Sequence, residues 1–187
     1  MNAPSSGLLQ RVQLPRHYRI ERADEAGATA AMSLRRAIFC TEQGLFVGDD
    51  RDQADDHAIL LVARPALPET EGEAWGPVVG TVRIHQLENR IWQGSRLAVA
   101  AEFRRVGVIG GALIQLAVRT ANTLGCERFV AQVQAPNVPL FRRLHWQTVR
   151  EITMHGQPHH LMQADLQHYP AFAADEAMCV EVRRGQS

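Results

Sequence analysis

Arginines and glycines gather in one segment, where a predicted strand ends and a long helix begins. The segment Arg96–Leu113 reads RLAVAAEFRRVGVIGGAL and holds Arg104, Arg105 and three glycines. The first backbone N–H groups of a helix have no partner within the helix, so they attract anions. Glycine lets a bulky anion approach the main chain, and arginine adds hydrogen bonds to phosphate oxygens. This pattern predicts a binding site for a ligand that carries a diphosphate.

Glycines at the start of a helix can serve several roles. A Walker phosphate loop needs Gly-Lys followed by Ser or Thr, which this segment lacks. A dinucleotide-binding fold places its glycines after the first strand of a parallel unit, whereas these follow the fourth predicted strand. Glycines that only allow a helix to pack closely on a strand account for the cluster about as well. Taken alone, the segment supports a packing role and a diphosphate site, such as one for coenzyme A, about equally.

The elements that must position this segment follow the order β-α-β-β-β-α-β-α-β-β. Alternating or continuous apolar runs predict strands at residues 17–22, 57–63, 78–84, 96–99, 128–134, 148–155 and 159–166. Helical periodicity predicts helices at residues 26–39, 109–124 and 138–144. We therefore expect a mixed α/β sandwich without internal repeats.

Length and composition limit the domain organisation and the partners. The chain has 187 residues, which is enough for one well-filled core but short for two domains. We expect a flexible N-terminal segment at 1–16, one domain at 17–166 and a C-terminal tail at 167–187. Twenty basic and twenty acidic residues leave a net charge of zero, which argues against a nucleic-acid partner.

Hydropathy and cysteine usage point to a cytoplasmic protein. No apolar run approaches the roughly 18 residues that a membrane helix needs, so we expect no membrane partner. The stretch Met1–Leu14 lacks a basic region followed by an apolar core, which argues against a secretory signal. The cysteines at 40, 126 and 179 are too far apart for a disulfide framework or a zinc site and indicate reduced thiols.

Three segments resemble the GNAT superfamily of acyl-CoA N-acyltransferases. Residues 97–114 (LAVAAEFRRVGVIGGALI) resemble its acetyl-CoA signature, Arg/Gln-x-x-Gly-x-Gly/Ala, after the fourth strand. Residues 78–84 (VVGTVRI) resemble its third strand, and residues 131–146 (AQVQAPNVPLFRRLHW) resemble its fifth strand, asparagine and following short helix. The resemblance covers about residues 17–166. It implies a mostly antiparallel, splayed sheet with helices on both faces, and transfer of an acetyl or other acyl group to a primary amine of a small molecule.

The resemblance also implies acetyl-CoA as co-substrate and no metal. Strand backbone at Leu97, Ala98 and Val99 would face the pantetheine arm, which Asn137 would also contact. The pyrophosphate would lie against Arg104, Arg105, Val106, Gly107, Val108, Gly110 and Gly111. The signature is offset, because counting from Arg104 places Ile109 at the second glycine position, whereas counting from Arg105 places Val108 at the first. A one-residue insertion near Ile109 would reconcile the two.

Acyl transfer to an amine needs a base, because an alkylamine has a pKa near ~10 and is mostly protonated at neutral pH. The side chains that qualify are Glu42, Asp50, Asp52, Asp55, Asp56, His57, His85, His159 and His160. We take Glu42 and His85 as the catalytic candidates. Glu42 follows the first helix, where acceptor-binding residues lie in the family. Phe141 occupies the position of the tyrosine that serves many members as the acid.

Plainer interpretations apply to most of these side chains. The aspartates of the acidic loop 49–56 fit a solvated surface loop with helix caps better than a site for a cationic amine. His155, His159 and His160 flank a predicted turn, and two of them could share a face. No carboxylate or cysteine lies at ligand spacing near them, so we expect no metal site.

Two other functions remain open. The front half, from LRRAIFCTEQGLF to GSRLAV, also resembles acyl-homoserine-lactone synthases and GNAT proteins linked to nitrilase gene clusters. Those synthases carry a glutamate before the Ser-Arg of the fourth strand, where this chain has Gln93. A non-catalytic CoA-binding sensor is the second alternative, which the missing tyrosine favours. The expected partner is a small-molecule amine, and a homodimer is allowed.

Overall fold

A computed structural model describes residues 14–67, 74–171 and 177–182. Most of the expected N-terminal segment, residues 1–13, lies outside the described residues. The side chains of two predicted pyrophosphate residues, Arg105 and Val106, also lie outside them. Within the described ranges, no helix is both long enough and apolar enough to cross a membrane.

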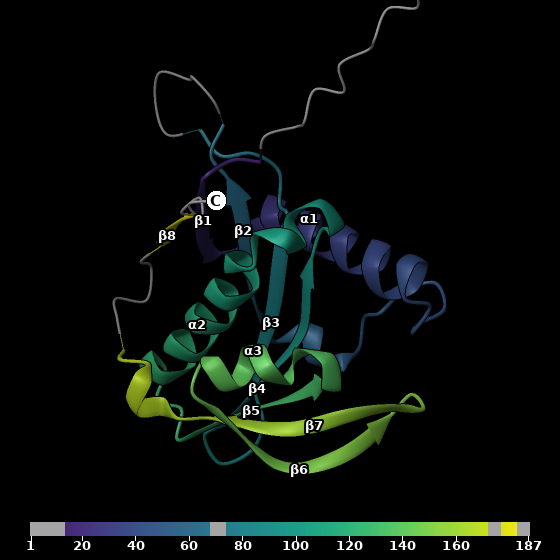
Figure 1. Ribbon diagram of the computed structural model, residues 1–187, viewed down its shortest axis with the longest axis vertical. Coiled ribbons are helices and arrows are strands. Elements are labelled where there is room, and N and C mark those ends of the chain that lie inside the picture. The colour runs from purple at the N-terminus through teal and green to yellow at the C-terminus, as the bar shows by residue number, and fades with distance from the viewer. Residues whose placement is uncertain (1–13, 68–73, 172–176, 183–187) are drawn as a thin grey trace, which may run out of the picture.

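In the described residues, eight strands form one sheet (Figure 1). They are β1 (His17–Arg22), β2 (Ile59–Pro65), β3 (Gly80–Gln86), β4 (Ile91–Val99), β5 (Arg128–Gln134), β6 (Trp146–Met154), β7 (Gln157–Ala164) and β8 (Met178–Glu181). Their order across the sheet is β6-β7-β5-β4-β3-β2-β1-β8. Every neighbouring pair is antiparallel except β4 with β5, which is parallel.

Helices cover both faces of this sheet. The helix α1 (Glu25–Arg35) begins at Asp24, whose carboxylate accepts a hydrogen bond from the Gly27 N–H at 2.7 Å. It continues as a π-helix, η1 (Arg36–Glu42). The other α-helices are α2 (Val108–Thr123) and α3 (Val138–Arg143), and short 3₁₀ turns are η2 (Gln53–Asp56), η3 (Ala101–Val106), η4 (Ala135–Asn137) and η5 (Leu166–His168).

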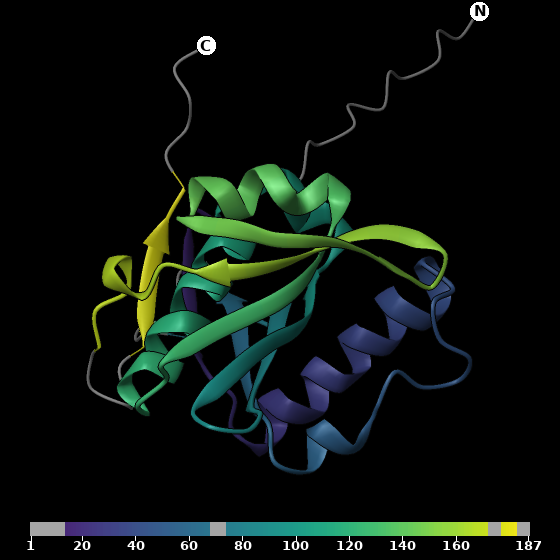
Figure 2. The same cartoon turned by 90° about the horizontal axis from the view of Figure 1, so that it is seen from below.

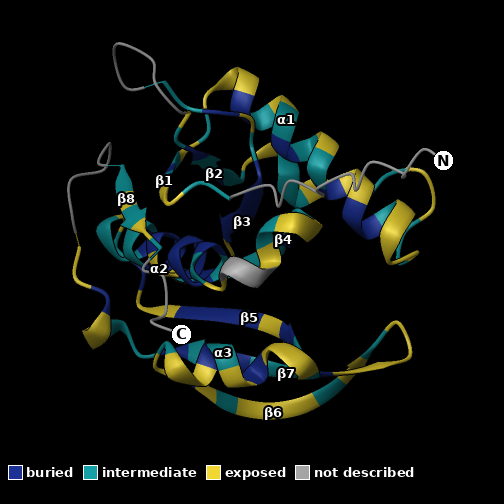
Figure 3. Ribbon diagram, turned by 45° about the horizontal axis from the view of Figure 1, so that its top comes forward, coloured by how far each residue is buried: buried dark blue, intermediate teal, exposed yellow. Residues whose placement is uncertain are grey.

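The core lies mainly between α2 and the sheet. Ile109, Leu113 and Leu116 of α2 are buried together with strand residues such as Ile20 and Ile84. Their spacing places them on one face of the helix, which explains why this helix could be predicted. Gly80 of β3 allows the close approach, because a Cβ there would lie 3.0 Å from side chains of Ile109 and Leu113. Figure 3 shows α2 and β5 mostly buried and β6 mostly exposed.

The fold confirms the predicted order β-α-β-β-β-α-β-α-β-β and adds one strand. Strand β8 lies at residues 178–181, within the expected tail, and pairs with β1. Strand β4 begins at Ile91, five residues earlier than the predicted start at Arg96. The sheet is mostly antiparallel with helices on both faces, as the family resemblance implied.

Candidate functional site

The sheet opens between its two parallel strands. Strands β4 and β5 pair only from Ile91 opposite Arg128 to Gly94 opposite Ala131. Both strands continue beyond this point, to Val99 and Gln134, without pairing with each other. Within the part of the chain that the structure describes, the edge of β4 that faces β5 therefore has no strand partner after Gly94.

A β-bulge shapes β4 where the strands separate. Thr81 of β3 lies opposite Ala98 and Arg83 lies opposite Ser95, so two residues of β4 face one residue of β3. Arg96 lies in this bulge with a φ of 53°, a left-handed conformation that costs energy for a residue with a side chain. The bulge redirects the main chain at the edge of the opening.

A cavity of about 200 Å³ lies in this opening. Its apolar wall includes Phe39, Phe46, Leu97, Phe129 and Phe141. Its polar lining consists of Gln43, Gln93, Ser95, Arg96, Gln132, Gln134, Asn137, His155 and His159. No aspartate or glutamate is among the described residues that line it. The cavity thus combines an extensive apolar wall with neutral amides, one hydroxyl, one guanidinium and two imidazoles.

Two segments meet at one side of the cavity. The loop that follows η1 lies beside the tip of the β6–β7 hairpin (Figure 2). There the ring of Phe46 packs edge-on against the ring of His155, with 5.5 Å between their centroids. The Arg96 guanidinium lies 4.5 Å from the centroid of the same Phe46 ring. Phe46 therefore links the loop to both halves of the separated sheet.

The start of α2 has the properties expected of an anion site. Gly107 is the N-cap residue with a φ of 67°, and no described side chain caps the helix there. Among the described residues, a Cβ at Gly110 would meet no atom within 4 Å, and one at Gly111 would meet only Leu144, at 3.9 Å. Packing within the described chain therefore does not require glycine at position 110. Glycine in a helix costs ~1 kcal/mol relative to alanine, so a close-approaching ligand is a good reason for it.

Two residues predicted for different roles contact each other. The Arg104 guanidinium binds the Glu42 carboxylate through two hydrogen bonds, of 2.5 and 2.7 Å, and also donates to the Val99 carbonyl. The hydrogen bond from Arg104 lowers the pKa of Glu42. Glu42 does not line the cavity. In this arrangement Glu42 is a weak base that holds Arg104 beside the end of β4.

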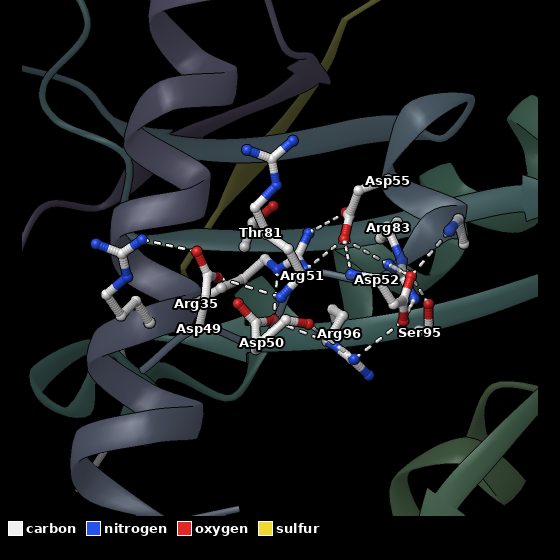
Figure 4. A network of polar contacts seen from close by, with 12 residues as sticks. Arg35, Asp49, Asp50, Arg51, Asp52, Asp55, Thr81, Arg83, Ser95 and Arg96 are labelled. Atoms are coloured by element: carbon white, nitrogen blue, oxygen red, sulfur yellow. Dashed lines mark hydrogen bonds and ion pairs between the residues drawn. The ribbon is translucent and has the colours of Figure 1, made fainter. Parts of the chain in front are cut away.

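Three arginines and three aspartates form a closed ring of ion pairs (Figure 4). The six residues are Arg35, Arg83, Arg96, Asp50, Asp52 and Asp55. Arg35 contacts Asp50 at 2.8 Å and Asp55 at 2.6 Å. Arg83 contacts Asp52 at 2.6 Å and Asp55 at 2.8 Å. Arg96 contacts Asp50 at 3.0 Å and Asp52 at 3.1 Å. Each charge therefore has two partners of opposite sign.

The ring corrects the solvated-loop interpretation for Asp50 and Asp55 only, because Asp52 and Asp56 are exposed as expected. The side chains of Asp50 and Asp55 are buried, with exposed fractions of 0% and 1%. Burial opposes the charge of Asp55, but hydrogen bonds from Arg35 and from the Asp52 N–H hold its pKa below the usual range. The cap interpretation is right for Asp52, which caps η2 by accepting from the Ala54 N–H. The loop is fixed by arginines far away in the sequence, and it holds Arg96 at the bulge.

His85 lies outside the cavity. It is buried on β3, and its ring packs edge-on against His57 at 5.9 Å. Burial lowers its pKa, and the nearby charge of Arg83 adds to the effect. Its Nδ1 has no hydrogen-bond partner among the described residues. The two catalytic candidates, Glu42 and His85, are thus not brought together, and neither lines the cavity.

Two of the predicted cofactor residues line the opening, and those from Arg104 to Gly111 are not among its described lining residues. Leu97 and Asn137 line the cavity, Ala98 is buried and Val99 is half-buried. Phe141 lines the cavity and packs edge-on against Trp146 at 5.0 Å, so it offers a hydrocarbon wall where a tyrosine would offer a hydroxyl.

Sequence reasoning missed most of the polar lining. Gln93 lines the cavity with a neutral amide, where the lactone-synthase resemblance expects a glutamate. His155 and His159 line the cavity, but His160 does not. Their positions on either side of a turn were a usable signal, because alternate residues of a strand share a face. The described residues contain no group of three or more side chains suited to a metal ion.

Comparisons with known proteins agree with this geometry. A model of the acetyltransferase (GNAT) family matches residues 31–146. A search of curated proteins finds no match. The fold is similar to that of an Escherichia coli protein, ElaA, at 18% identity and a TM-score of 0.61, covering 79% of this chain and 98% of that one. It is also similar to an acyl-CoA N-acyltransferase from Pseudomonas aeruginosa, at 17% identity and a TM-score of 0.61, covering 79% of this chain and 98% of that one.

Proposed function

The chain belongs to the acetyltransferase (GNAT) family, and on that basis we propose that it transfers an acetyl or other acyl group from acyl-CoA to a primary amine of a small molecule. The observation that carries the proposal is the separation of β4 from β5 after Gly94, with a cavity in the opening. A thioester in this opening would lie beside a strand edge whose backbone groups lack a strand partner. Fixed N–H donors of that kind stabilise the oxyanion that forms when an amine attacks a thioester carbonyl.

The start of α2 supports acyl-CoA as the co-substrate. No side chain of the described residues caps its first N–H groups, and none of them fills the space beside Gly110. Both features fit a pyrophosphate at a helix N-terminus. In this proposal the main chain from Arg104 to Gly111 holds the pyrophosphate, and the strand edge at Leu97–Val99 holds the pantetheine arm together with Asn137. Acyl-CoA supplies the activated acyl group.

The cavity lining supports a small polar acceptor. Gln43, Gln93, Gln132 and Gln134 place amide groups around the space, and each amide can both donate and accept hydrogen bonds. No carboxylate among the described lining residues is available to hold an ammonium group. An ammonium group has no lone pair with which to attack, so the acceptor amine must lose its proton before transfer, and the neutral polar groups can orient the rest of the molecule.

The test combines binding and turnover. Calorimetry should detect binding of CoA and acetyl-CoA. Incubation of acetyl-CoA with a panel of amines should release free thiol, and mass spectrometry should identify the acylated amine. Absence of CoA binding would refute the proposal.

Phe141 favours one other function, a CoA-binding sensor, because it removes a hydroxyl that could protonate the leaving thiolate. Binding of CoA without thiol release on any amine would support that sensor and contradict the enzyme.

A further inference from the structure

An acyltransferase site needs a group that accepts the proton of the amine, and the cavity offers few. Its titratable lining residues are Arg96, His155 and His159, and no carboxylate lines it among the described residues. Arg96 keeps its proton at any working pH and is bound to Asp50 and Asp52. The proton acceptor must therefore be a histidine, if it belongs to the cavity lining.

His159 has a hydrogen bond that determines where its proton lies. Its Nδ1 is 3.0 Å from the carbonyl oxygen of Gln157. A carbonyl oxygen only accepts, so Nδ1 carries the hydrogen, and the lone pair of the neutral ring is on Nε2. No residue of the described chain forms a hydrogen bond with this Nε2. The ring thus presents a basic nitrogen that is free to accept a proton.

The position of His159 is well defined. It lies on β7, paired with Gln134 of β5 on one side and with Ile152 of β6 on the other. The residue is 8% exposed and lines the cavity. A strand held on both sides positions a side chain more firmly than a loop does.

The two neighbouring histidines lack this combination. His155 also lines the cavity, but it lies at the hairpin turn with a φ of 49°, and its described contact is the ring of Phe46. His160 follows His159 directly and so points to the opposite face of β7, where its Nδ1 lies 3.3 Å from Thr148 Oγ1. His160 does not line the cavity, which makes it a matched control.

We propose that His159 is the general base of the acyl transfer, an inference that rests on the function proposed above. Its Nε2 accepts a proton from the amine nitrogen as the new C–N bond forms. The C–S bond breaks, its electron pair leaves with sulfur, and the thiolate takes a proton from water. The imidazolium then returns its proton to solvent.

The decisive variant is His159→Asn. The amide nitrogen of asparagine occupies about the position of Nδ1 and can still donate to the Gln157 carbonyl, but nothing replaces Nε2. We expect kcat to fall by about 10²-fold or more, since general bases contribute roughly 10²–10⁴-fold. The acid limb of the pH–rate profile should disappear, and the Kd for CoA should stay within about twofold of wild type. His160→Asn should retain the wild-type rate and profile.

The outcomes separate this inference from the proposed function. Thiol release by His159→Asn at the wild-type rate, with the acid limb intact, would overturn the base assignment and leave the acyltransferase intact. Absence of thiol release from the wild-type protein would refute both. If His159→Asn does not fold, diethyl pyrocarbonate treatment of the wild-type protein decides the question. Carbethoxylation of His159, mapped by peptide mass spectrometry, should parallel the loss of activity, and full modification with retained activity would overturn the assignment.

Discussion

Replacing Asp55 with asparagine should destabilise the protein strongly, because it breaks the ring of ion pairs at a buried position. Asp55 accepts hydrogen bonds from Arg35 at 2.6 and 3.0 Å and from Arg83 at 2.8 Å. Asparagine is uncharged and places an N–H group near these donors. Removing one partner of a buried ion pair costs about 3–5 kcal/mol, because the remaining charges stay buried without compensation. At about 2–4 °C per kcal/mol for a chain of this size, we expect Tm to fall by roughly 6–20 °C.

The matched control is Asp49→Asn. Asp49 pairs with Arg36 at 2.8 Å, but their side chains are 40% and 60% exposed, in contrast to the buried Asp55. Exposed ion pairs contribute only about 0–1 kcal/mol, so this variant should unfold close to wild type. Urea denaturation at pH 7 measures both free energies of unfolding. A loss below about 1 kcal/mol in Asp55→Asn would refute the claim that the ring stabilises the fold.

The effect of Asp55→Asn should also depend on pH. The pKa of Asp55 is lower in the folded protein than the value of about 3.9 in an unfolded chain. The charge therefore contributes its full stability above about pH 4 to 5, and this contribution is lost as the pH falls toward the folded pKa. The difference in stability between wild type and variant should be constant from pH 7 to 5 and should shrink below about pH 4. A difference that is unchanged at pH 3 would contradict the assignment.

Three further variants test the site and its surroundings. Gly110→Ala should raise the free energy of unfolding by up to ~1 kcal/mol, because the added Cβ meets no atom of the described residues within 4 Å. Calorimetry should nevertheless show weaker CoA binding, and unchanged affinity would place the pyrophosphate elsewhere. Arg104→Ala should weaken CoA binding several-fold at low salt. Glu42→Gln should not weaken it, because the substitution frees the Arg104 guanidinium from its carboxylate partner. If Arg104→Ala binds CoA as tightly as wild type, Arg104 is not a pyrophosphate ligand. Burial lowers the pKa of His85, so the neutral ring contributes stability above the unfolded pKa of about 6.5, and this contribution is lost as the pH falls. His85→Gln should therefore flatten the dependence of the free energy of unfolding on pH between pH 7 and 5. An unaltered slope would contradict the assigned burial effect.

Periodic elements could be predicted from the sequence because local patterns determine them. The apolar face of α2 repeats over four turns, and the prediction at residues 109–124 differs from the observed Val108–Thr123 by one residue at each end. The bounds of strand β4 were harder to predict from the sequence. Its residues beside the cavity face neither a packed core nor open solvent, so apolar and polar residues do not alternate along it. The bulge at Arg96 interrupts the pattern further.

Contacts between distant residues could not be predicted in the same way. The burial of Asp50 and Asp55 depends on arginines of α1, β3 and β4, which a local pattern does not reveal. Glu42 and Arg104 were each predicted for a site role, but their ion pair joins residues 62 positions apart. The family signature led to the start of α2, whereas the cavity lining emerged only when β4 and β5 were placed side by side.

The pairing of β1 with β8 has a consequence for how the protein is made. His17 lies opposite Glu181 and Ile20 opposite Met178, so the first strand in the sequence receives one of its two neighbours from the last. During synthesis on a ribosome, one edge of β1 stays without this partner, with its N–H and C=O groups unpaired, until residues 178–181 have emerged. Unpaired strand edges promote aggregation, so a chain shortened before residue 178 should be less soluble when expressed, even though every residue around the cavity would still be present.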